Sequence, residues 1–440
     1  MTATDVESGQ PANPAPGAAP PQTLWHHGDF LKFWFGETVS LFGTQVTNLA
    51  LPLTAVLVFN AGPAQVGFLR FLQLVPYLGL ALLFGAWVDR RRKRPVLIAA
   101  NLVRMVLIAL IPILHAVHHL SMPTLLILAT AIGVASVAFD VSWMSFVPAL
   151  VKDPKHYVEA NQKLSVTASS ADVAGPGIAG ALVGAFTAPT ALVVDAFSYL
   201  ASLLTLVLVR APEPRPKPAA AKRHIGAEVR EGLSFVFRHP ILRPLALIAP
   251  FCNFSLVTVW TMFLLYAART ERMSPALIGV VFSASSVGGL IGGLLSGRAI
   301  KRFPLGPVYG VSMSAIFLSP LLIPLAGGPR PVLVGMFIAS FFLSYLGLGV
   351  AGVVMISLRQ TCTPPSLMGR MNAAFRTVLF GGGALGGLSG GFIAEAMGLR
   401  PGLTVVAIGS AAVVVGLAVS PVSRLRALPP AAAEPVPDPL

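Results

Sequence analysis

Long apolar runs separated by short polar segments dominate this chain. Each run is about 20 residues long or more, the length an α-helix needs to cross roughly 30 Å of hydrocarbon. Twelve runs are present, at residues 32–58, 64–88, 95–116, 123–148, 163–186, 188–209, 243–266, 276–297, 307–326, 332–356, 372–396 and 402–420. Because lipid offers the backbone no hydrogen-bond partners, each run is expected to be a helix; a membrane barrel would show short alternating segments instead. The pattern predicts an all-α membrane protein with twelve transmembrane helices.

The longest interruption, residues 210–242, separates six runs from six. Its second part has apolar residues at the spacing of a short amphipathic helix. The two halves also share a weak repeat: residues 85–90 correspond to 293–298, and residues 159–180 to 370–391. Such a repeat predicts two pseudo-symmetric six-helix bundles with a substrate site between them, near the middle of the membrane.

Basic residues are concentrated in alternate loops. If both termini are cytoplasmic, most of the 31 Lys and Arg residues lie on the inner side, as the positive-inside rule requires. The mean hydropathy of +0.77 and the charged fraction of 11% argue against a soluble enzyme, in which about 25% of residues are charged. Membrane topology explains the net charge of +14, so we expect lipid headgroups and no nucleic acid as partners of these basic loops.

These features predict five parts and a location. The parts are a disordered cytosolic tail at 1–29, an N-terminal bundle at 30–209, a cytoplasmic linker at 210–242, a C-terminal bundle at 243–420 and a cytosolic tail at 421–440. The chain has only two cysteines, so no structural disulfide is expected. We expect a monomer in the inner membrane of a bacterium.

The loop after the second run reads GAWVDRRRKRP. Gly85 is expected to permit close helix contact, Asp89 is an acid at a cytoplasmic helix end, and the basic residues from Arg90 onward hold the loop at the inner face. A plain topogenic loop would explain the arginines, but not Asp89 or the related residues Gly293 and Arg298. The segment resembles the signature loop of the major facilitator superfamily.

That resemblance implies a cytoplasmic gate. In the family, the aspartate meets the positive end of a helix in the other half and latches the inner side; here the target would lie near residues 369–372. The second copy carries Gly297 where an acid would stand, so a mirrored latch is doubtful. The expected gate residues are Gly85, Asp89, Arg90 and Arg298.

The fifth run contains ADVAGPGIAG, in which Gly175 and Pro176 weaken one helical turn and Gly180 extends a smooth face. The segment resembles the glycine-proline motif of exporters and antiporters in the superfamily, although a generic packing kink is the alternative. Further stretches, such as REGLSFVFRHPILRPL, are similar to the bacterial exporter branch with macrolide-efflux and enterobactin-export proteins.

Charged residues deep in the membrane are functional candidates because inserting each costs about 2.5–3.5 kcal/mol. All the deep ones lie in the N-terminal half. Arg70 is one of them, and the others are the proton-coupling candidates: Asp172, Glu37, Asp140, Arg104 and Asp195. A structural Arg104–Asp140 ion pair and a packing role for Asp195 remain alternatives.

Helical spacing arranges several of these acids in polar stripes. Glu37, Ser40, Thr44, Thr47 and Asn48 fall on one face of the first helix, and Asp195 begins a similar stripe on the sixth. We expect such stripes to face a wet cavity. The C-terminal half contributes aromatic and apolar candidates for the cavity wall, although lipid-facing packing is the commoner role for each phenylalanine. The expected cavity residues are Thr44, Asn48, Asn253, Phe254, Trp260 and Tyr345.

These residues favour a secondary active transporter that exports a hydrophobic small molecule, such as a drug, an antibiotic or a siderophore, in exchange for protons. A nutrient importer of the same fold and a non-transporting membrane scaffold are the alternatives. No lysine follows a glycine anywhere in the chain, so a phosphate-binding P-loop is absent and ATP is not expected to drive transport. Neither catalysis, a cofactor nor a metal site is expected.

Overall fold

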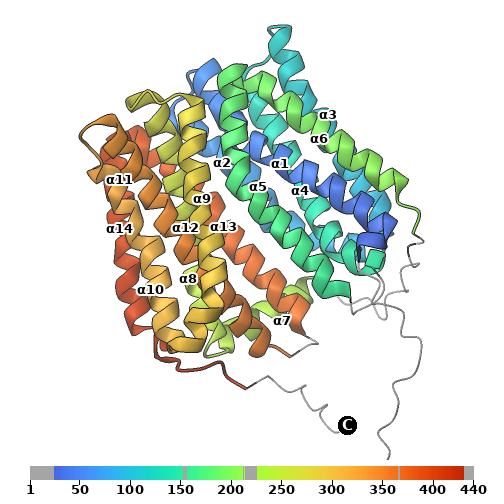
Figure 1. Ribbon diagram of the computed structural model, residues 1–440, viewed down its shortest axis with the longest axis vertical. Helices are drawn as coiled ribbons and strands as arrows, with labels where there is room; N and C mark the ends of the chain where they lie inside the picture. Colours follow the sequence, from blue (N-terminus) through green and yellow to red (C-terminus); the bar gives the residue numbers. More distant parts are fainter. Residues whose placement is uncertain (1–23, 152–155, 212, 214–224, 365–366, 431–440) are drawn as a thin grey trace, which may run out of the picture.

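The computed structural model describes residues 24–151, 156–211, 213, 225–364 and 367–430. Most of the two predicted tails, at 1–23 and 431–440, and the proline-rich start of the linker lie outside these residues. All regular secondary structure in the described part is helical (Figure 1).

Twelve long helical segments fill the described part. Six belong to the N-terminal half: α1 (Gly28–Val58), α2 (Pro63–Asp89), α3 (Lys93–Ala116), α4 (Met122–Val151), α5 (Tyr157–Ala185) and α6 (Ala188–Leu208). The other six are α8 (Leu242–Leu265), which continues as a π-helical turn at Tyr266–Thr270, then α9 (Pro275–Arg302), α10 (Leu305–Leu318) with the short extensions η4 (Ser319–Leu321) and α11 (Leu322–Leu325), α12 (Arg330–Thr361), α13 (Met368–Met397) and α14 (Leu399–Val419). Short 3-10 turns at Leu24–His26 and Pro421–Arg424 flank them.

The prediction of twelve membrane helices is confirmed. Ten of these segments are long and apolar enough to cross a membrane, and α2 and α5, of 27 and 29 residues, complete the set. Each predicted run corresponds to one segment, and the ends differ by no more than two helical turns. The helices start where the sequence supplies a cap: Ser274, for example, accepts a hydrogen bond from the Leu277 amide at 3.3 Å, and Pro275 follows in the first turn.

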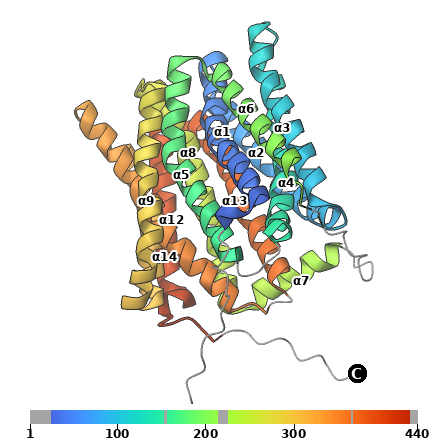
Figure 2. The same ribbon diagram turned by 45° about the vertical axis from the view of Figure 1, so that its right-hand side comes forward.

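The halves form two bundles that meet along two helix pairs, α2 with α13 and α5 with α9 (Figures 1 and 2). The pairs are related by the internal repeat, in which α2 corresponds to α9 and α5 to α13. We call the end where α2 and α9 begin the outer end, following the charge-based topology, and the opposite end the inner end.

Glycine–glycine contacts close the outer end. A Cβ atom added to Gly180 would lie 2.5 Å from the Pro275 carbonyl oxygen and 2.9 Å from the Cα of Gly279. In the second pair, a Cβ atom on Gly67 would lie 2.7 Å from the Cα of Gly391. Only glycine allows backbones to approach so closely, and these residues therefore hold the two bundles together at this end.

The inner end differs. Gly85, Gly293 and Gly297 have nothing within 4 Å of where a Cβ atom would stand. The expectation that Gly85 permits close helix contact is therefore wrong for this conformation, because no neighbour lies within contact distance of the position that its Cβ atom would take. Close glycine contacts between the bundles are thus found at the outer end and not at these three inner positions.

Helix α7 (Ile225–Arg238) crosses the inner end and docks on the start of α13 (Figure 2). Arg370 on α13 forms an ion pair with Glu231 at 2.7 Å. A Cβ atom on Gly232 would lie 2.7 Å from the Arg370 carbonyl oxygen, so the two backbones touch directly. The linker thus contacts the helix start that the sequence assigned to the gate.

Candidate functional site

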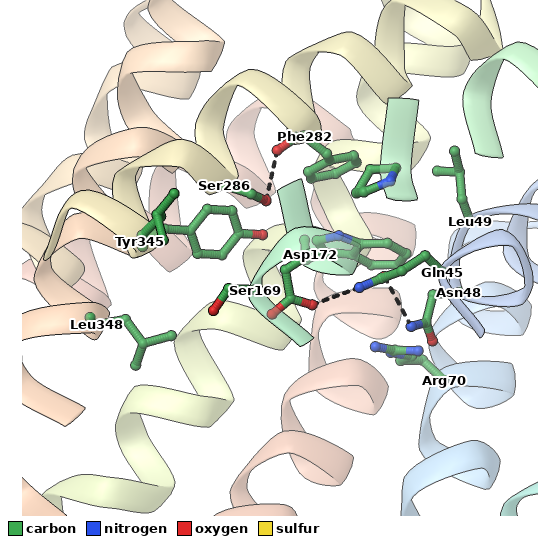
Figure 3. A pocket seen from close by; sticks show the side chains of 15 residues that line it. Gln45, Asn48, Leu49, Arg70, Ser169, Asp172, Phe282, Ser286, Tyr345 and Leu348 are labelled. Atoms are coloured by element: carbon green, nitrogen blue, oxygen red, sulfur yellow. Dashed lines mark hydrogen bonds between the residues drawn. The ribbon is translucent and has the colours of Figure 1, made fainter. Parts of the chain in front are cut away.

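A cavity of about 400 Å³ lies between the bundles, lined by residues of α5 and α9 on the inner side of their glycine contact (Figure 3). Three helices of the N-terminal bundle and three of the C-terminal bundle form it. Its lining residues are Gln45, Asn48 and Leu49 of α1, Arg70 of α2, Ser169, Asp172 and Pro176 of α5, Trp260 of α8, Phe282, Ser286, Gly289 and Leu290 of α9, and Tyr345, Leu348 and Gly349 of α12. This volume falls in the range of small-molecule sites, roughly 300–1,000 Å³.

Asp172 presents a carboxylate to this cavity from the middle of α5. Its Oδ1 accepts a hydrogen bond of 2.6 Å from Gln45 Nε2. Gly175 makes this contact sterically feasible, since a Cβ atom there would lie 2.5 Å from Gln45 Cγ. One half of the glycine-proline motif therefore serves to bring the amide of α1 to the acid of α5.

The proline serves a second purpose. Pro176 has no N–H, so the backbone carbonyl of Asp172, four residues earlier, has no helical donor. The next amide, that of Gly177, donates to the Ser283 hydroxyl on α9 at 2.7 Å. The kink thus gives α5 a hydrogen bond to the opposite bundle directly above the cavity.

Arg70 supplies the opposite charge. Its Nη1 donates to Gln73 Oε1 at 3.1 Å, and its guanidinium carbon lies 5.0 Å from the ring centroid of Trp260, a cation–π contact across the bundle interface. Its Nε is buried without a hydrogen-bond partner among the described residues. A Cβ atom on Gly387 would lie 3.0 Å from the Arg70 stem, which therefore packs on α13.

Aromatic rings form much of the remaining wall. Trp260 and Phe282 stack with centroids 5.5 Å apart, and Phe341 lies edge-on to Phe282 at 5.2 Å. Tyr345 follows at 6.2 Å from Phe341. The N-terminal bundle thus provides most of the charge and the C-terminal bundle most of the apolar surface.

The stripes on α1 and α6 lie elsewhere. Asp195 is fully buried and accepts hydrogen bonds from Thr47 Oγ1 and from Ser198 Oγ, the latter at 2.8 Å. Gly43 fits against Ser198 and Asp195 at the same seam. The expectation that these stripes face a wet cavity is wrong for Thr47 and Asp195, because they bond to each other inside one bundle. Of the α1 stripe, Asn48 does line the cavity.

Glu37 lies on the same face of α1 as Thr47, which donates to Asp195. It is 6% exposed, and its Oε2 has no hydrogen-bond partner among the described residues. The charge of Arg104 acts on it electrostatically. Glu37 therefore belongs to the interior of the N-terminal bundle and not to the cavity lining.

Arg104 and Asp140 have separate partners. The Arg104 guanidinium donates to Asn101 and lies 3.9 Å and 4.5 Å from the ring centroids of Phe139 and Tyr199. Asp140 accepts a 2.8 Å hydrogen bond from the hydroxyl of Tyr77. Within the described part of the chain no ion pair joins the two, which differs from the structural pair considered above.

Three of the six expected cavity residues, Asn48, Trp260 and Tyr345, line the cavity. The others do not. Thr44 Oγ1 lies 3.5 Å from the Tyr199 hydroxyl, and Asn253 Nδ2 donates to the Leu379 carbonyl at 2.8 Å. The backbone of Phe254 packs on Gly386 in the α8–α13 contact.

The expected cytoplasmic gate is only partly described. Asp89 is the last residue of α2, and its side chain lies outside the described part, so the latch is not visible. Arg90 and Arg298 are exposed.

At the outer end, two residues from the C-terminal half hold the loop between α1 and α2. Glu395 Oε2 accepts a hydrogen bond from the Ala64 amide at 3.3 Å, in the first turn of α2. Arg269 Nη2 donates to the Ala61 carbonyl at 2.6 Å. A carboxylate at a helix N-terminus is stabilised by the helix dipole, so this contact reinforces the closed outer end.

Sequence reasoning missed several cavity residues. The sequence pattern identifies Arg70 as a deep charge but does not place it in the cavity. It does not single out Gln45, Ser169 or Ser286. Gln45 lies about 100° around the helix from Thr44, which is enough to turn it from the α6 seam toward α5.

Two six-helix bundles around a central cavity with unpaired polar groups define a membrane transporter. The family model for the Major Facilitator Superfamily matches residues 33–387, and the chain belongs to this family, whose members are transporters and not enzymes. It is therefore a multi-pass membrane protein.

Similar proteins include exporters. The multidrug efflux pump Tap of Mycolicibacterium fortuitum is 26% identical over 91% of this chain and 97% of its own length. Macrolide efflux protein A of Streptococcus pyogenes is 21% identical over 61% of this chain and 66% of its own length. Among solved structures, the nucleoside transporter NupG (TM-score 0.71, 12% identity, 89% of this chain and 98% of that one) and an inward-facing bacterial homologue of the iron transporter ferroportin (TM-score 0.66, 16% identity, 90% and 99%) share the fold.

Proposed function

We propose that this protein is a secondary active transporter that exports a hydrophobic small molecule in exchange for protons. The observation that carries the proposal is the exposure of the Asp172 carboxylate in a cavity between the two bundles, beside the kink that bonds α5 to α9. An acid at this place meets both the cargo and the interface that must open and close during alternating access.

Asp172 is the proposed proton carrier. When the carboxylate is ionised, Gln45 donates to it; when a proton binds, the charge disappears and a carboxylic O–H becomes available as a donor. The two states therefore differ in how they hold α1 against α5. A cargo that favours one of these states shifts the equilibrium between conformations, which is what coupling requires.

The available energy is adequate. One proton moving through 100 mV supplies about 2.3 kcal/mol, enough for a roughly fiftyfold concentration gradient of cargo. Export is favoured over import because relatives that cover most of their own length and of this chain are named as efflux pumps. We place the protein in a bacterial inner membrane, with both termini in the cytosol and the cavity open to the inside.

Everted membrane vesicles from an efflux-deficient bacterium test this proposal. Vesicles containing the protein are energised by respiration, and uptake is measured for a panel of apolar fluorescent dyes and antibiotics. We expect uptake that a protonophore abolishes and that Asp172→Asn lacks. Asp29→Asn removes an acid that pairs with Lys32 at the start of α1, away from the cavity, and is the matched control.

Two results would contradict the proposal. Uptake that persists with the protonophore would exclude proton coupling. Accumulation in right-side-out vesicles, with none in everted ones, would favour an importer of the same fold.

A further inference from the structure

The cavity holds two opposite charges that do not pair with each other. Arg70 donates to the neutral amide of Gln73, and Asp172 accepts from the neutral amide of Gln45. Among the described residues no ion pair joins Arg70 to Asp172. Both side chains nevertheless line the same hollow, with their charged ends turned into it (Figure 3).

Each charged group therefore lacks an oppositely charged partner among the described residues. Arg70 is half-buried in a partly apolar site and loses hydration there, of which a neutral amide returns only part. The buried Arg70 Nε lacks even that. Asp172 is exposed to the cavity and accepts one hydrogen bond, from Gln45. A ligand with one acidic and one basic group would supply both missing partners at once, whereas a purely cationic or neutral ligand would leave Arg70 as it is.

The aromatic wall of the cavity suits a ligand with a flat ring system. The stacked pair of Trp260 and Phe282 is beside the guanidinium of Arg70. Tyr345, on α12, lines the same cavity. The cavity volume of about 400 Å³ is adequate for a drug-sized aromatic molecule.

We propose that the cargo is an amphoteric aromatic molecule, with its ring against Trp260 and Phe282, its acidic group on Arg70 and its basic amine on Asp172. This inference rests on the proposed function, since it takes the cavity to be the transport site. It assigns different roles to the two charges. The amine competes with the proton for Asp172, while Arg70 holds the acidic group in both protonation states of Asp172.

The experiment uses three related probes and the purified full-length protein in lipid nanodiscs. Norfloxacin carries a carboxylic acid and a piperazine amine on an aromatic ring; its ethyl ester lacks the acid, and its N-acetyl derivative lacks the basic amine. Binding is measured by calorimetry at neutral pH. We expect norfloxacin to bind roughly ten- to hundredfold more tightly than either derivative, as expected for one charge-assisted hydrogen bond.

Variants assign each preference to one residue. Arg70→Gln is expected to remove the preference for norfloxacin over its ester, and Asp172→Asn the preference over the N-acetyl derivative. Arg70→Lys keeps the charge and is expected to retain most of the first preference, which shows that a loss in Arg70→Gln does not come from misfolding. Arg330→Gln, at the exposed first residue of α12, is the control and should leave all three affinities unchanged.

Three outcomes would overturn the inference: no binding of norfloxacin, equal binding of all three probes, or an equal loss for norfloxacin and its ester in Arg70→Gln. The proposed function fails differently, by the absence of protonophore-sensitive uptake in vesicles. Selective binding without such uptake would keep the ligand class and remove proton-driven export. Proton-coupled uptake of neutral dyes that Arg70→Gln does not change would support proton-driven export and exclude the proposed ligand class.

Discussion

Asp172 and Asp195 look alike along the chain but lie in opposite surroundings. Both are single acids near the middle of a membrane helix. Asp172 faces the cavity between the bundles and accepts one hydrogen bond from an amide, whereas Asp195 is fully buried inside one bundle and accepts from two hydroxyls. The difference teaches that depth in the membrane does not by itself place an acid at the interface between the bundles, which is where the proposed coupling requires one.

The largest effect is expected at Asp172. Asp172→Asn removes the titrating group from the cavity, so proton-driven uptake in everted vesicles should fall to the level of vesicles without the protein. Asp195→Asn should retain protonophore-sensitive uptake when scaled to the amount of folded protein. If the two variants behaved in the same way, the comparison between the acids would be invalid.

The closed outer end is the next place to test, since the proposed inward-open state depends on it. Gly180→Ala places a methyl group 2.5 Å from the Pro275 carbonyl oxygen, so the bundles must separate there. We expect transport to fall about tenfold or more, for a cost of roughly 1.4 kcal/mol or more in the closed state, and cysteines introduced above the cavity to become accessible from outside.

Gly184→Ala is the matched control one turn along α5. Its Cβ atom would lie 3.6 Å from the Ala276 side chain, an ordinary contact. Its transport and cysteine labelling should stay close to those of the unmodified protein. Equal effects at the two glycines would argue against the close contact as the cause.

Asp195 should be important for stability. In Asp195→Asn, one of the two hydroxyl donors faces an amide N–H instead of a carboxylate oxygen, and the fully buried seam loses hydrogen bonds to a charged group. We expect a loss of about 1–3 kcal/mol, seen as a lower melting temperature in detergent or nanodiscs. An unchanged melting temperature would show that the α1–α6 seam does not depend on this acid.

Glu37 provides a third acid with which to test the comparison between Asp172 and Asp195. It is the other leading proton-coupling candidate of the sequence, yet it lies inside the N-terminal bundle. We expect Glu37→Gln to keep coupled uptake and to change stability by less than about 1 kcal/mol, because one carboxylate oxygen has no partner to lose. Loss of coupling in this variant, with normal expression, would instead extend the proton path into the N-terminal bundle.

The smallest expected effect is the pH dependence of stability at His239, a residue outside the membrane helices. His239 Nδ1 accepts hydrogen bonds from the amides of Ile241 and Leu242 at 3.2 and 3.3 Å, and partial burial lowers the pKa of its imidazole. The neutral form is therefore favoured in the folded protein. Its contribution to stability is present above the unfolded-state pKa and is lost as the pH falls through the lower folded-state value.

A melting series from pH 7.5 to 5.5 measures this contribution. We expect a small decrease for the unmodified protein that His239→Asn, whose side-chain oxygen can also accept these bonds without titrating, does not show. The same decrease in both would assign it to other groups. The measurement separates this background from pH effects at Asp172.

Much of the fold was predictable because one physical requirement dominates it. Apolar runs of membrane length must be helices, so twelve helices and their approximate ends follow from hydropathy alone. The break at 210–242 and the repeat located the two halves. Asn48, Trp260 and Tyr345 line the cavity as expected.

The remaining features of the site depend on which helices pack against each other. The stripe on α1 is polar because it meets another polar stripe on α6, and a sequence pattern cannot distinguish a polar neighbour from water. Gln45, one position from Thr44, therefore lines the cavity although Thr44 does not. Gly85 was expected to be in contact because small residues are typical of packed helices, but contacts at the inner end depend on the conformational state.

The glycine contacts at the outer end have a mechanical consequence. Interlocked side chains would have to change rotamers one after another before two helices could part, and each change would add to the kinetic barrier. Gly67, Gly180, Gly279 and Gly391 present bare backbone instead, so the bundles can be drawn apart in one motion and brought back to the same register without repacking. The turnover rate can then depend on the release of cargo and protons and not on the repacking of interlocked side chains in every cycle.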